Sequence, residues 1–326
     1  MMNDVIISSR VRLARNLAEY PFPNRTTGAQ KKEICAKVKE TFDGNKNFGT
    51  ASFSSLSAEQ RLALVEKHLI SHEFASHPEG RELITGANLS IMINEEDTFR
   101  IQSIMPGFDL DTAYRKVSLA DDFIDEKFVY AFDRTLGYLT ACPTNLGCAM
   151  RASVMVHLPG LTRSGELEGL VSSLSGLGYT VRGIYGEGSG SGGHIYQISN
   201  MRSAGKSERE IIDDLKKIAV KIVDSEQKAR RNIYEKYPIR TEDRIYRSLA
   251  AAQSARILSE KEYFEILTDI SEGITCGIVK DITPETLYST LGTLLTATIM
   301  AENPGVTDGF SRRIHRAQMF REIFTQ

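Results

Sequence analysis

The stretch Cys142-Pro143-Thr144-Asn145-Leu146-Gly147, followed four residues later by Arg151, is the most informative part of this sequence for the fold. Proline, asparagine and glycine favour turns, so the stretch predicts a turn between two regular elements. Before it, residues 128–132 and 138–141 read as two strands and predict a hairpin. After it, residues 151–158 fit a helix or a strand about equally well.

Five arginines stand at the ends of predicted elements or beside turns: Arg10, Arg12, Arg100, Arg151 and Arg182. An arginine is always charged and can bind two phosphate oxygens at once. Phosphoryl transfer from a triphosphate requires several such contacts, because the charge on the non-bridging oxygens must be neutralised. Arg100 follows the acidic turn Asn94-Glu95-Glu96-Asp97, and Arg182 precedes a glycine-rich loop. Any one of them alone is most simply a surface charge, but together they predict a phosphate-binding site.

The composition excludes several classes of protein. Of the 326 residues, 41% are hydrophobic, and the formal net charge is −2. These values allow two domains with sizeable cores and argue against a protein that coats nucleic acid or an anionic membrane. The start of the chain predicts no secretory signal, and the most apolar stretch, residues 287–301, is short for a membrane span. The four cysteines form no CxxC pair. We therefore expect a cytoplasmic protein with reduced thiols, no nucleic-acid partner and no membrane segment.

Hydrophobic periodicity predicts an α+β protein in two parts. Strands are expected at residues 4–7, 89–93, 99–104, 179–185 and 195–199, and helices at residues 57–70, 110–126 and 165–177. A capping box at Ser207 and Glu210 begins a long helix that runs to Tyr237, before Pro238. The later helices are expected at residues 242–258, 260–272, 284–301 and 311–324. The pattern predicts a largely antiparallel sheet flanked by helices in residues 1–237 and a smaller all-α domain in residues 238–326.

Three short patterns imitate ligand sites but have simpler explanations. The glycines between residues 188 and 193 match GxGxxG, yet a strand follows where a dinucleotide site needs a helix. Residues 200–207 lack the first glycine of a P-loop, and Ser207 is better explained as a helix cap. The histidines between residues 68 and 77 have no carboxylate at the spacing of a zinc protease, so no protein-bound metal is predicted.

Four motifs, in one order along about 180 residues, resemble the guanidino-phosphagen kinase superfamily, which includes arginine kinase and creatine kinase. The motifs are Ser8-Ser9-Arg10-Val11-Arg12, residues 94–100 (NEEDTFR), residues 142–147 (CPTNLG) and residues 182–187 (RGIYGE). Phosphagen kinases carry a helical domain of roughly 100 residues before the first motif, which holds the α-carboxylate and amine of a free amino acid. Here that motif starts at Ser8, so we expect this domain to be absent.

Further strings resemble one branch of the superfamily, the bacterial protein-arginine kinases: residues 65–71, 90–94, 151–159 and 242–248. The resemblance covers nearly the whole chain and implies an enzyme that transfers the ATP γ-phosphoryl group to arginine guanidinium groups of proteins, marking them for stress regulation or proteolysis. It implies ATP as cofactor, with Mg²⁺ carried by the nucleotide. The implied partners are protein substrates with exposed arginine, a zinc-binding activator protein, a ClpC-type AAA+ protease and a second copy of the chain. Two alternatives stay open: a kinase of free arginine or another small guanidino compound, and a catalytically degenerate phosphoarginine adaptor.

The matching positions imply roles for single residues. Glu96 is the implied base, because a guanidinium must be oriented and must lose a proton as the N–P bond forms. Glu187 is implied as the second carboxylate, and Cys142 as a thiol that tunes the acceptor electrostatically without becoming a covalent nucleophile. Arg100, Arg151 and Arg182 are implied to be catalytic through the phosphoryl group in transfer. The implied nucleotide contacts are Ser8, Ser9, Arg10, Val11, Arg12, His68, Arg100, Arg151, Ala152, Ser153, Val154, Met155, Arg182, Gly183, Ile184, Tyr185, Gly186 and Glu187.

The sequence departs from the family at several positions. Thr98 stands where histidine is usual, Cys148 where threonine is common, and Gly190 where the loop usually carries a glutamate. In the tail, protein-arginine kinases carry an RDxxRA motif that binds phosphoarginine, and the matching stretch here is residues 312–317, RRIHRA. Arg313 replaces the acid that would pair with the ligand's guanidinium. We therefore expect a degenerate phosphoarginine pocket at Arg312, Arg313 and Arg316.

Overall fold

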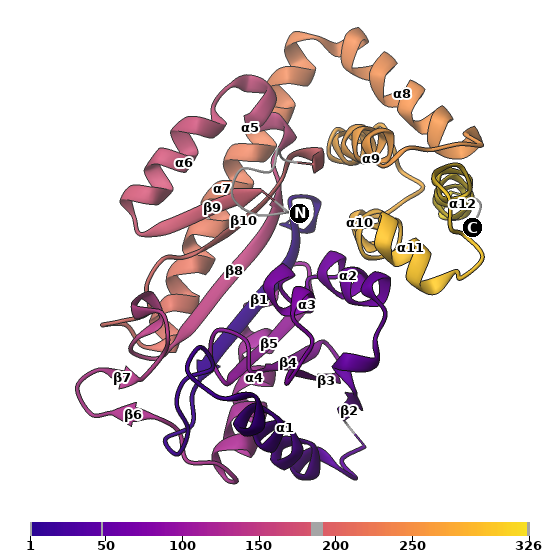
Figure 1. Ribbon diagram of the computed structural model, residues 1–326. Helices are drawn as coiled ribbons and strands as arrows, with labels where there is room; N and C mark the ends of the chain where they lie inside the picture. Colours follow the sequence, from indigo (N-terminus) through magenta and orange to yellow (C-terminus); the bar gives the residue numbers. More distant parts are fainter. Residues whose placement is uncertain (1, 47, 184–191, 325–326) are drawn as a thin grey trace.

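The structure, a computed structural model, describes residues 2–46, 48–183 and 192–324. Within these residues, eight antiparallel strands form one sheet in the order β2-β3-β4-β5-β1-β8-β10-β9 (Figure 1). Their bounds are β1 Ile6–Arg15, β2 Phe48–Ala51, β3 Glu82–Gly86, β4 Leu89–Ile93, β5 Phe99–Pro106, β8 Met150–His157, β9 Tyr179–Gly183 and β10 Ile195–Asn200. The antiparallel α+β architecture expected from the sequence is confirmed.

The hairpin predicted before the CPTNLG stretch is also present, but it is shorter than expected. It consists of β6 (Phe132–Asp133) and β7 (Gly137–Tyr138) and lies outside the main sheet. In Figure 1 it projects from the lower left of the molecule. The stretch itself forms a 3-10 turn over Pro143–Asn145 and leads into β8.

Strand β1 is the central strand and is longer than the sequence indicated. Periodicity predicted a strand only at residues 4–7, whereas β1 has ten residues. Its side chains alternate, so that Val11 and Leu13 are buried on one face while Arg10 and Arg12 lie on the other. The charged residues of this alternation explain why hydrophobic periodicity indicated only the first part of the strand. The ambiguity at residues 151–158 is resolved as strand, because β8 pairs with β1 on one side and β10 on the other.

The face of the sheet that carries Val11 and Leu13, here the core face, is covered by helices. Residues of the core-face helices pack with the strands into the largest hydrophobic cluster of the described chain. The helices are α1 Gly28–Phe42, α4 Leu110–Asp125, α5 Pro159–Ser164, α6 Leu167–Gly176 and α7 Glu208–Lys236. Helix α7 begins with the capping box predicted at Ser207 and Glu210. Burial of these apolar faces fixes the sheet and leaves its opposite face free for chemistry.

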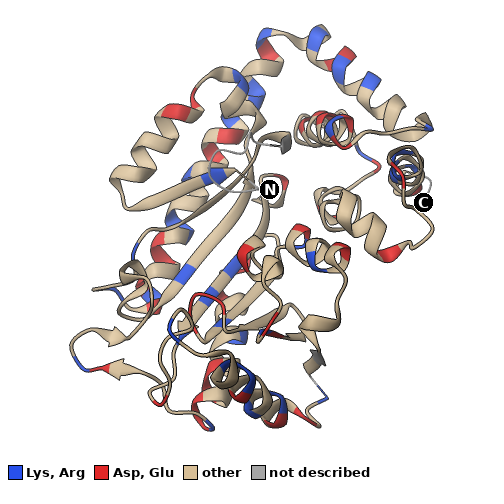
Figure 2. Cartoon of the chain, in the orientation of Figure 1, with Lys and Arg blue, Asp and Glu red and all other residues tan. Residues whose placement is uncertain are grey.

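The opposite face, here the cleft face, is covered only at its two sides. Over β3 and β4 lie α2 (Ala58–Glu66) and α3 (His72–Ser76), which share a small hydrophobic cluster with these strands. Helix α2 ends at Glu66, earlier than the predicted helix end at Ile70. The other side is occupied by the C-terminal helices. Figure 2 shows Lys and Arg residues along the strands between these two covers.

The C-terminal helices form a second hydrophobic cluster, centred on Tyr263, Leu267 and Phe320. They are α8 Pro238–Ser254, α9 Glu260–Thr275, α10 Pro284–Ser289, α11 Thr296–Glu302 and α12 Gly309–Glu322. The helix predicted at residues 284–301 is therefore two short helices with a 3-10 turn at Thr290–Gly292 between them. We refer to residues 238–324 as the tail. No helix in the described ranges is both long and apolar enough to span a bilayer.

Buried polar groups join the tail to the sheet. His157, at the end of β8, is fully buried and contacts three tail hydroxyls, those of Thr268, Ser271 and Tyr288, at 3.1–3.2 Å. Arg230 of α7 pairs with Glu226 at 2.6 Å and donates to Thr275 at 2.7 Å. Because buried polar groups are costly unless they are paired, these contacts fix how the tail lies against the sheet.

Candidate active site

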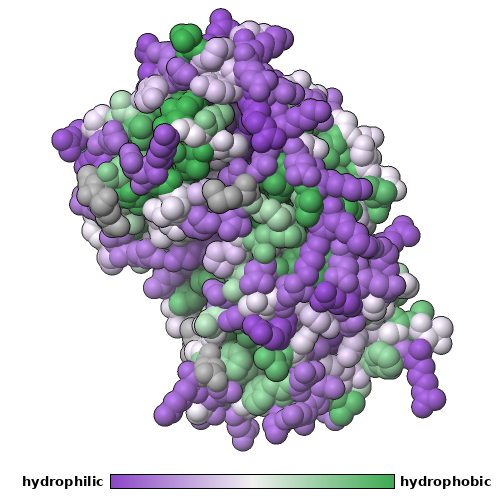
Figure 3. Space-filling model, turned by 180° about the vertical axis from the view of Figure 1, so that it is seen from behind, coloured by the Kyte–Doolittle hydropathy of each residue, from purple (hydrophilic) through white to green (hydrophobic). Residues whose placement is uncertain are grey.

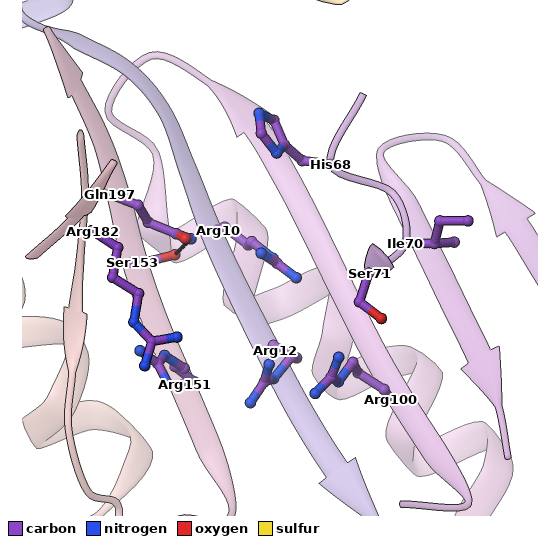
Figure 4. Close-up of a pocket in the computed structure, with 10 residues that line it drawn as sticks. All are labelled: Arg10, Arg12, His68, Ile70, Ser71, Arg100, Arg151, Ser153, Arg182 and Gln197. Carbon is purple, nitrogen blue, oxygen red and sulfur yellow. Dashed lines mark hydrogen bonds between the residues drawn. The ribbon is translucent and has the colours of Figure 1, made fainter. Parts of the chain in front are cut away.

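A cleft of about 190 Å³ opens on the cleft face, and all five predicted arginines line it (Figure 4). Its lining residues are Arg10, Arg12, His68, Ile70, Ser71, Arg100, Arg151, Ser153, Arg182 and Gln197. The sheet register explains why distant residues meet here. Arg12 lies opposite Arg151 of β8, and Ala14 lies opposite Arg100 of β5. Directly paired residues of antiparallel strands share a face, so β1 gathers these side chains into one site.

Two of these arginines are not at element ends, as the sequence indicated, but in the middle of β1. Burial, together with the nearby charges of Arg100 and Arg151, lowers the pKa of Arg10 to about 10. The pKa of Arg12 is also lowered, by burial first and then by Arg100, Arg10 and Arg151. Like charges held this close repel one another. The cleft is therefore a strong site for a polyanion, which would relieve the repulsion.

Neighbouring polar groups hold the arginines in place. Arg151 donates to Ser199 Oγ at 2.7 Å and to Thr180 Oγ1 at 3.0 Å. Arg10 donates through one terminal nitrogen to the side chain of Gln102. The Nε of Arg10 is buried and has no hydrogen-bond partner among the described residues. A buried donor without a partner is costly, so this atom also favours an acceptor oxygen in the cleft.

His68 enters the cleft from the end of α2. The helix closes with a double hydrogen bond, from His68 N to Val65 O at 2.8 Å and from Leu69 N to Leu64 O at 2.9 Å, which is the Schellman arrangement. His68 takes the left-handed position of this motif, with φ +57°, where glycine is usual. Burial, together with the charges of Arg10 and His72, lowers the pKa of His68 to about 4. At neutral pH the ring is therefore an uncharged group, suited to contacting a nucleotide.

The acidic turn predicted at residues 94–97 divides its carboxylates between two environments. Glu95 points inward, with 3% of its side chain exposed, and forms an ion pair with Arg100 and a hydrogen bond with Ser71. Glu96 points outward, with 44% exposed, and its Oε2 lies 3.6 Å from Nη2 of Arg100. Asp97 fixes the turn by accepting hydrogen bonds from Asn16 Nδ2 at 2.6 Å and from Ala141 N at 2.7 Å.

A second cavity of about 610 Å³ adjoins the arginine cleft and shares Ser71 and Arg100 with it. We call it the acceptor cavity. Its lining residues are Pro23, Asn24, Lys31, Ser71, Glu73, Arg81, Glu95, Glu96, Arg100 and Ala141. Cys142 is the next residue after Ala141 and is partly exposed, with its Sγ 3.0 Å from Thr144 Oγ1. An anion in the cleft and a cation in the acceptor cavity would therefore meet at Arg100.

Strand alternation divides the set of nucleotide contacts implied by the motifs into side chains that face the cleft and side chains that do not. The side chains of Val11, Ala152 and Val154 belong to the core-face cluster, and Ser9 is buried there with its hydroxyl donating to Gly107 O at 2.9 Å. These four side chains therefore do not line the cleft. Met155 packs against the tail cluster. The family motifs consist of consecutive residues, but in a strand only every second side chain can face a ligand on one side of the sheet.

The remaining implied nucleotide contacts lie partly in the cleft, partly elsewhere and partly outside the described residues. Ser153 lines the cleft, and Ser8 lies on β1 beside Met155 and opposite Pro106. Gly183 is the last residue of β9. Ile184, Tyr185, Gly186 and Glu187 lie outside the described residues. Thr98, at the position where the family has histidine, is buried and donates to Asn16 Oδ1.

The three tail arginines differ in their contacts and their exposure. Arg316 is buried and donates to Leu294 O at 2.7 Å, to Leu258 O at 3.1 Å and to Thr296 Oγ1 at 3.0 Å. Arg312 donates to Thr307 O at 2.9 Å, and Arg313 is exposed. The guanidinium of Arg316 therefore already has partners within the tail, including Glu260 at 3.4 Å. Position 313 lacks the acid of the motif.

Sequence reasoning missed three residues of the site. Gln102 donates to Leu69 O at 2.7 Å and to His68 O at 3.0 Å, and so joins Arg10 to the His68 segment. Gln197 lines the cleft opposite Arg182, and Ser71 lines both cavities. Uncharged side chains of this kind carry no motif signal. The strand pairing of Gln102 with Arg12 was the one feature that could have located it.

An arginine cleft that meets a carboxylate-lined acceptor cavity defines a site for transferring a phosphoryl group to a cationic acceptor. Residues 30–229 match the family model of the ATP:guanido phosphotransferase C-terminal catalytic domain. The chain belongs to this family. Its kinase and transferase character and its phosphagen-kinase fold follow from that membership.

Relatives and solved structures agree with this assignment. A protein-arginine kinase of Caldanaerobacter subterraneus subsp. tengcongensis is 43% identical over 85% of this chain and 84% of its own. The protein-arginine kinase of Bacillus subtilis is 37% identical over 98% of this chain and 90% of its own. Among solved structures, lombricine kinase has a TM-score of 0.61 and 27% identity over 69% of this chain and 67% of its own.

Proposed function

We propose that this protein is an ATP-dependent protein-arginine kinase, which phosphorylates the guanidinium groups of arginine side chains in proteins. The observation that carries the proposal is the junction of two cavities at Arg100: five arginines line one, and Glu96 lines the other. Relatives named protein-arginine kinase align with 98% of this chain, which supports the same activity here.

The reaction joins a guanidinium nitrogen to the γ-phosphorus of ATP and breaks the bond from that phosphorus to the bridging oxygen, which leaves with ADP. The acceptor nitrogen loses one proton in this step. We propose that Glu96 orients the guanidinium and takes that proton. Its carboxylate lines the acceptor cavity and lies near Arg100, which supports this role. The arginines would stabilise the charge on the phosphoryl oxygens. Glu187 remains our proposed second carboxylate and Cys142 our proposed tuning thiol.

Mg²⁺ would enter with the nucleotide. The described lining of the arginine cleft includes no carboxylate, the usual protein ligand of Mg²⁺, and its guanidinium groups would repel a free cation. Among the described residues no group of three or more His, Cys, Asp or Glu side chains is placed to hold a metal ion. When bound between phosphates, the ion supplies charge neutralisation, and the chain's own contribution is the arginine set.

One observation favours the alternative of a free-arginine kinase. Lys31 and Glu73 line the acceptor cavity and have the charges needed to bind the α-carboxylate and α-amine of a free amino acid. Incubation with Mg·ATP and either free arginine or an arginine-rich protein, followed by detection of acid-labile phosphate on each, separates the two. Phosphate on the protein alone supports our proposal. Phosphate on free arginine alone, abolished by Lys31→Ala, would favour the alternative, and no phosphate on either would favour an adaptor.

We further propose that the protein acts in the cytoplasm, in a stress response, with a zinc-binding activator protein and a ClpC-type AAA+ protease as partners. A homodimer formed through the tail belongs to the same proposal. Its support is the number of large apolar side chains exposed on the tail: Ile239, Tyr246, Ile257, Phe310 and Ile314. Figure 3 shows hydrophobic residues over the tail helices at the upper left of the rear view. Light scattering of the full chain tests the dimer.

A further inference from the structure

The first turn of α11 in the tail is capped by a residue from a different part of the chain. Glu66, the last residue of α2, accepts hydrogen bonds from Ala297 N at 2.8 Å, from Thr298 N at 2.7 Å and from Thr298 Oγ1 at 2.8 Å. Beside it, Lys67 pairs with Glu302 at 2.5 Å. We call these contacts the Glu66 clamp. Figure 1 shows α11 lying beside α2, although more than 200 residues separate them in sequence.

The position of Glu66 is unfavourable for α2 alone. A carboxylate at the C-terminal end of a helix meets the negative end of the helix dipole. The same carboxylate is favourable for α11, because the first backbone N–H groups of a helix have no partner within it. Glu66 therefore stabilises the contact between the two helices rather than the helix to which it belongs.

The clamp lies next to the arginine cleft. Two residues after Glu66, His68 stands in the left-handed position at φ +57°, which costs free energy for a residue other than glycine. A strained residue keeps its conformation only when its surroundings fix it. Gln102 fixes the segment on the sheet side, through the carbonyls of His68 and Leu69. The Glu66 clamp fixes it on the tail side.

We propose that Glu66 is a positioning residue, which uses the tail helix α11 to hold His68 in place in the nucleotide cleft. The inference rests on the proposed function, because it takes the arginine cleft as the ATP site. The tail then contributes to nucleotide affinity without touching the nucleotide. The effect is expected on nucleotide binding, whereas the acceptor cavity and Glu96 are left unchanged.

The test compares two Glu→Gln variants of the full chain that remove a carboxylate from the same end of α11. Glu66→Gln breaks the contact with α2. Glu260→Gln is the matched control, because Glu260 lies within the tail and accepts from Thr296 Oγ1 at 2.6 Å in the turn that begins α11. Binding of Mg·ADP by calorimetry is measured first. The KM for ATP and the kcat with an arginine-rich protein are measured next.

We expect Glu66→Gln to weaken Mg·ADP binding and raise the KM for ATP about tenfold, with kcat at saturating ATP within about twofold of wild type. Glu260→Gln should leave Mg·ADP binding within about twofold. Glu66→Asp, which keeps the charge on a shorter side chain, should recover part of the affinity. Thr298→Val removes one of the three bonds and should give a smaller loss that is not additive with Glu66→Gln.

Several results would overturn the inference. Mg·ADP affinity unchanged in Glu66→Gln, or equal losses in Glu66→Gln and Glu260→Gln, would show that the contact is only part of the tail interface. If Glu66→Gln does not fold, Thr298→Val decides, and unchanged affinity in that variant has the same meaning. Wild-type protein that binds Mg·ADP but phosphorylates no arginine would refute the proposed function and leave the clamp supported or refuted by its own binding data.

Discussion

The same substitution at the two neighbouring glutamates of the acidic turn should lower activity in both cases but lower stability in only one. Glu96→Gln removes the proposed base from an exposed site, so we expect kcat to fall about 100-fold or more while Mg·ADP binding and stability stay near wild type. Glu95→Gln removes a buried partner of Arg100, so we expect a loss of stability together with a loss of activity.

The expected sizes follow from the exposure of the pairs. The Glu95–Arg100 pair has side chains 3% and 13% exposed, and breaking a buried pair costs about 3–5 kcal/mol. Glutamine can still accept a hydrogen bond from Arg100, so we expect Glu95→Gln to lower the free energy of unfolding by less, about 2–3 kcal/mol. With an unfolding entropy of roughly 2.1 cal/mol/K per residue, the 326 residues give about 0.7 kcal/mol/K, and Tm should fall by about 3–4 °C. Glu96, 44% exposed and 3.6 Å from Arg100, should contribute under about 0.5 kcal/mol and shift Tm by less than about 1 °C.

The assay combines thermal unfolding, followed by circular dichroism, with the initial rate of acid-labile phosphate formation on an arginine-rich protein. Glu96→Asp serves as a second control, because it keeps the carboxylate and should retain part of the rate. A Glu96→Gln rate within a factor of two of wild type would refute the assignment of the base. A Tm loss in Glu96→Gln as large as that in Glu95→Gln would refute the division of roles between the two residues.

Four further outcomes are expected. Arg151→Lys should lose most of the turnover, because lysine lacks the planar fork that holds Ser199 and a phosphate together; full activity in this variant would make the arginine an ordinary charge. His68→Gly should change stability by no more than about 1 kcal/mol, since glycine relieves the strain at φ +57° but loosens the unfolded chain, and it should weaken Mg·ADP binding; unchanged binding would exclude a nucleotide contact. The pKa values of His68 and His157 are lowered in the folded state, to about 4 for His68. Below about pH 6.5 the unfolded chain therefore binds more protons than the folded protein, and Tm should fall as the pH is lowered from there. A Tm that does not change with pH in this range would contradict the burial of these rings. Free phosphoarginine should neither bind the tail nor stimulate the enzyme at micromolar levels, because Arg316 already has partners within the tail and Arg313 replaces the acid; tight binding that Arg316→Ala abolishes, measured by calorimetry, would show the opposite.

The sequence predicted the chemical content of the site better than its geometry. The five arginines were singled out because charged residues beside turns carry a signal of their own, and Glu96 and His68 because they lie in strings that match the family. The motif did not reveal which neighbours of Arg10 and Arg151 turn away from the cleft, because that depends on a strand whose charged residues hid its alternation. Gln102 and Glu66 could not be found, since each acts through a partner distant in the chain, and the hydrogen bonds of Glu66 reach residues 297 and 298.

Arg12 and Arg151 lie directly opposite each other on adjacent strands, so the sheet contains a pair of like charges that other contacts must offset. Like charges directly opposite each other destabilise an antiparallel pair, and burial adds to that cost. The next pair along the two strands, Val11 and Ala152, is fully buried on the core face and holds the strands together from the other side. A protein with no anion to bind would gain stability by replacing either arginine. Because phosphate oxygens in the cleft relieve this repulsion, nucleotide binding should stabilise the folded protein, and the stabilisation should rise with the logarithm of the nucleotide concentration above the dissociation constant.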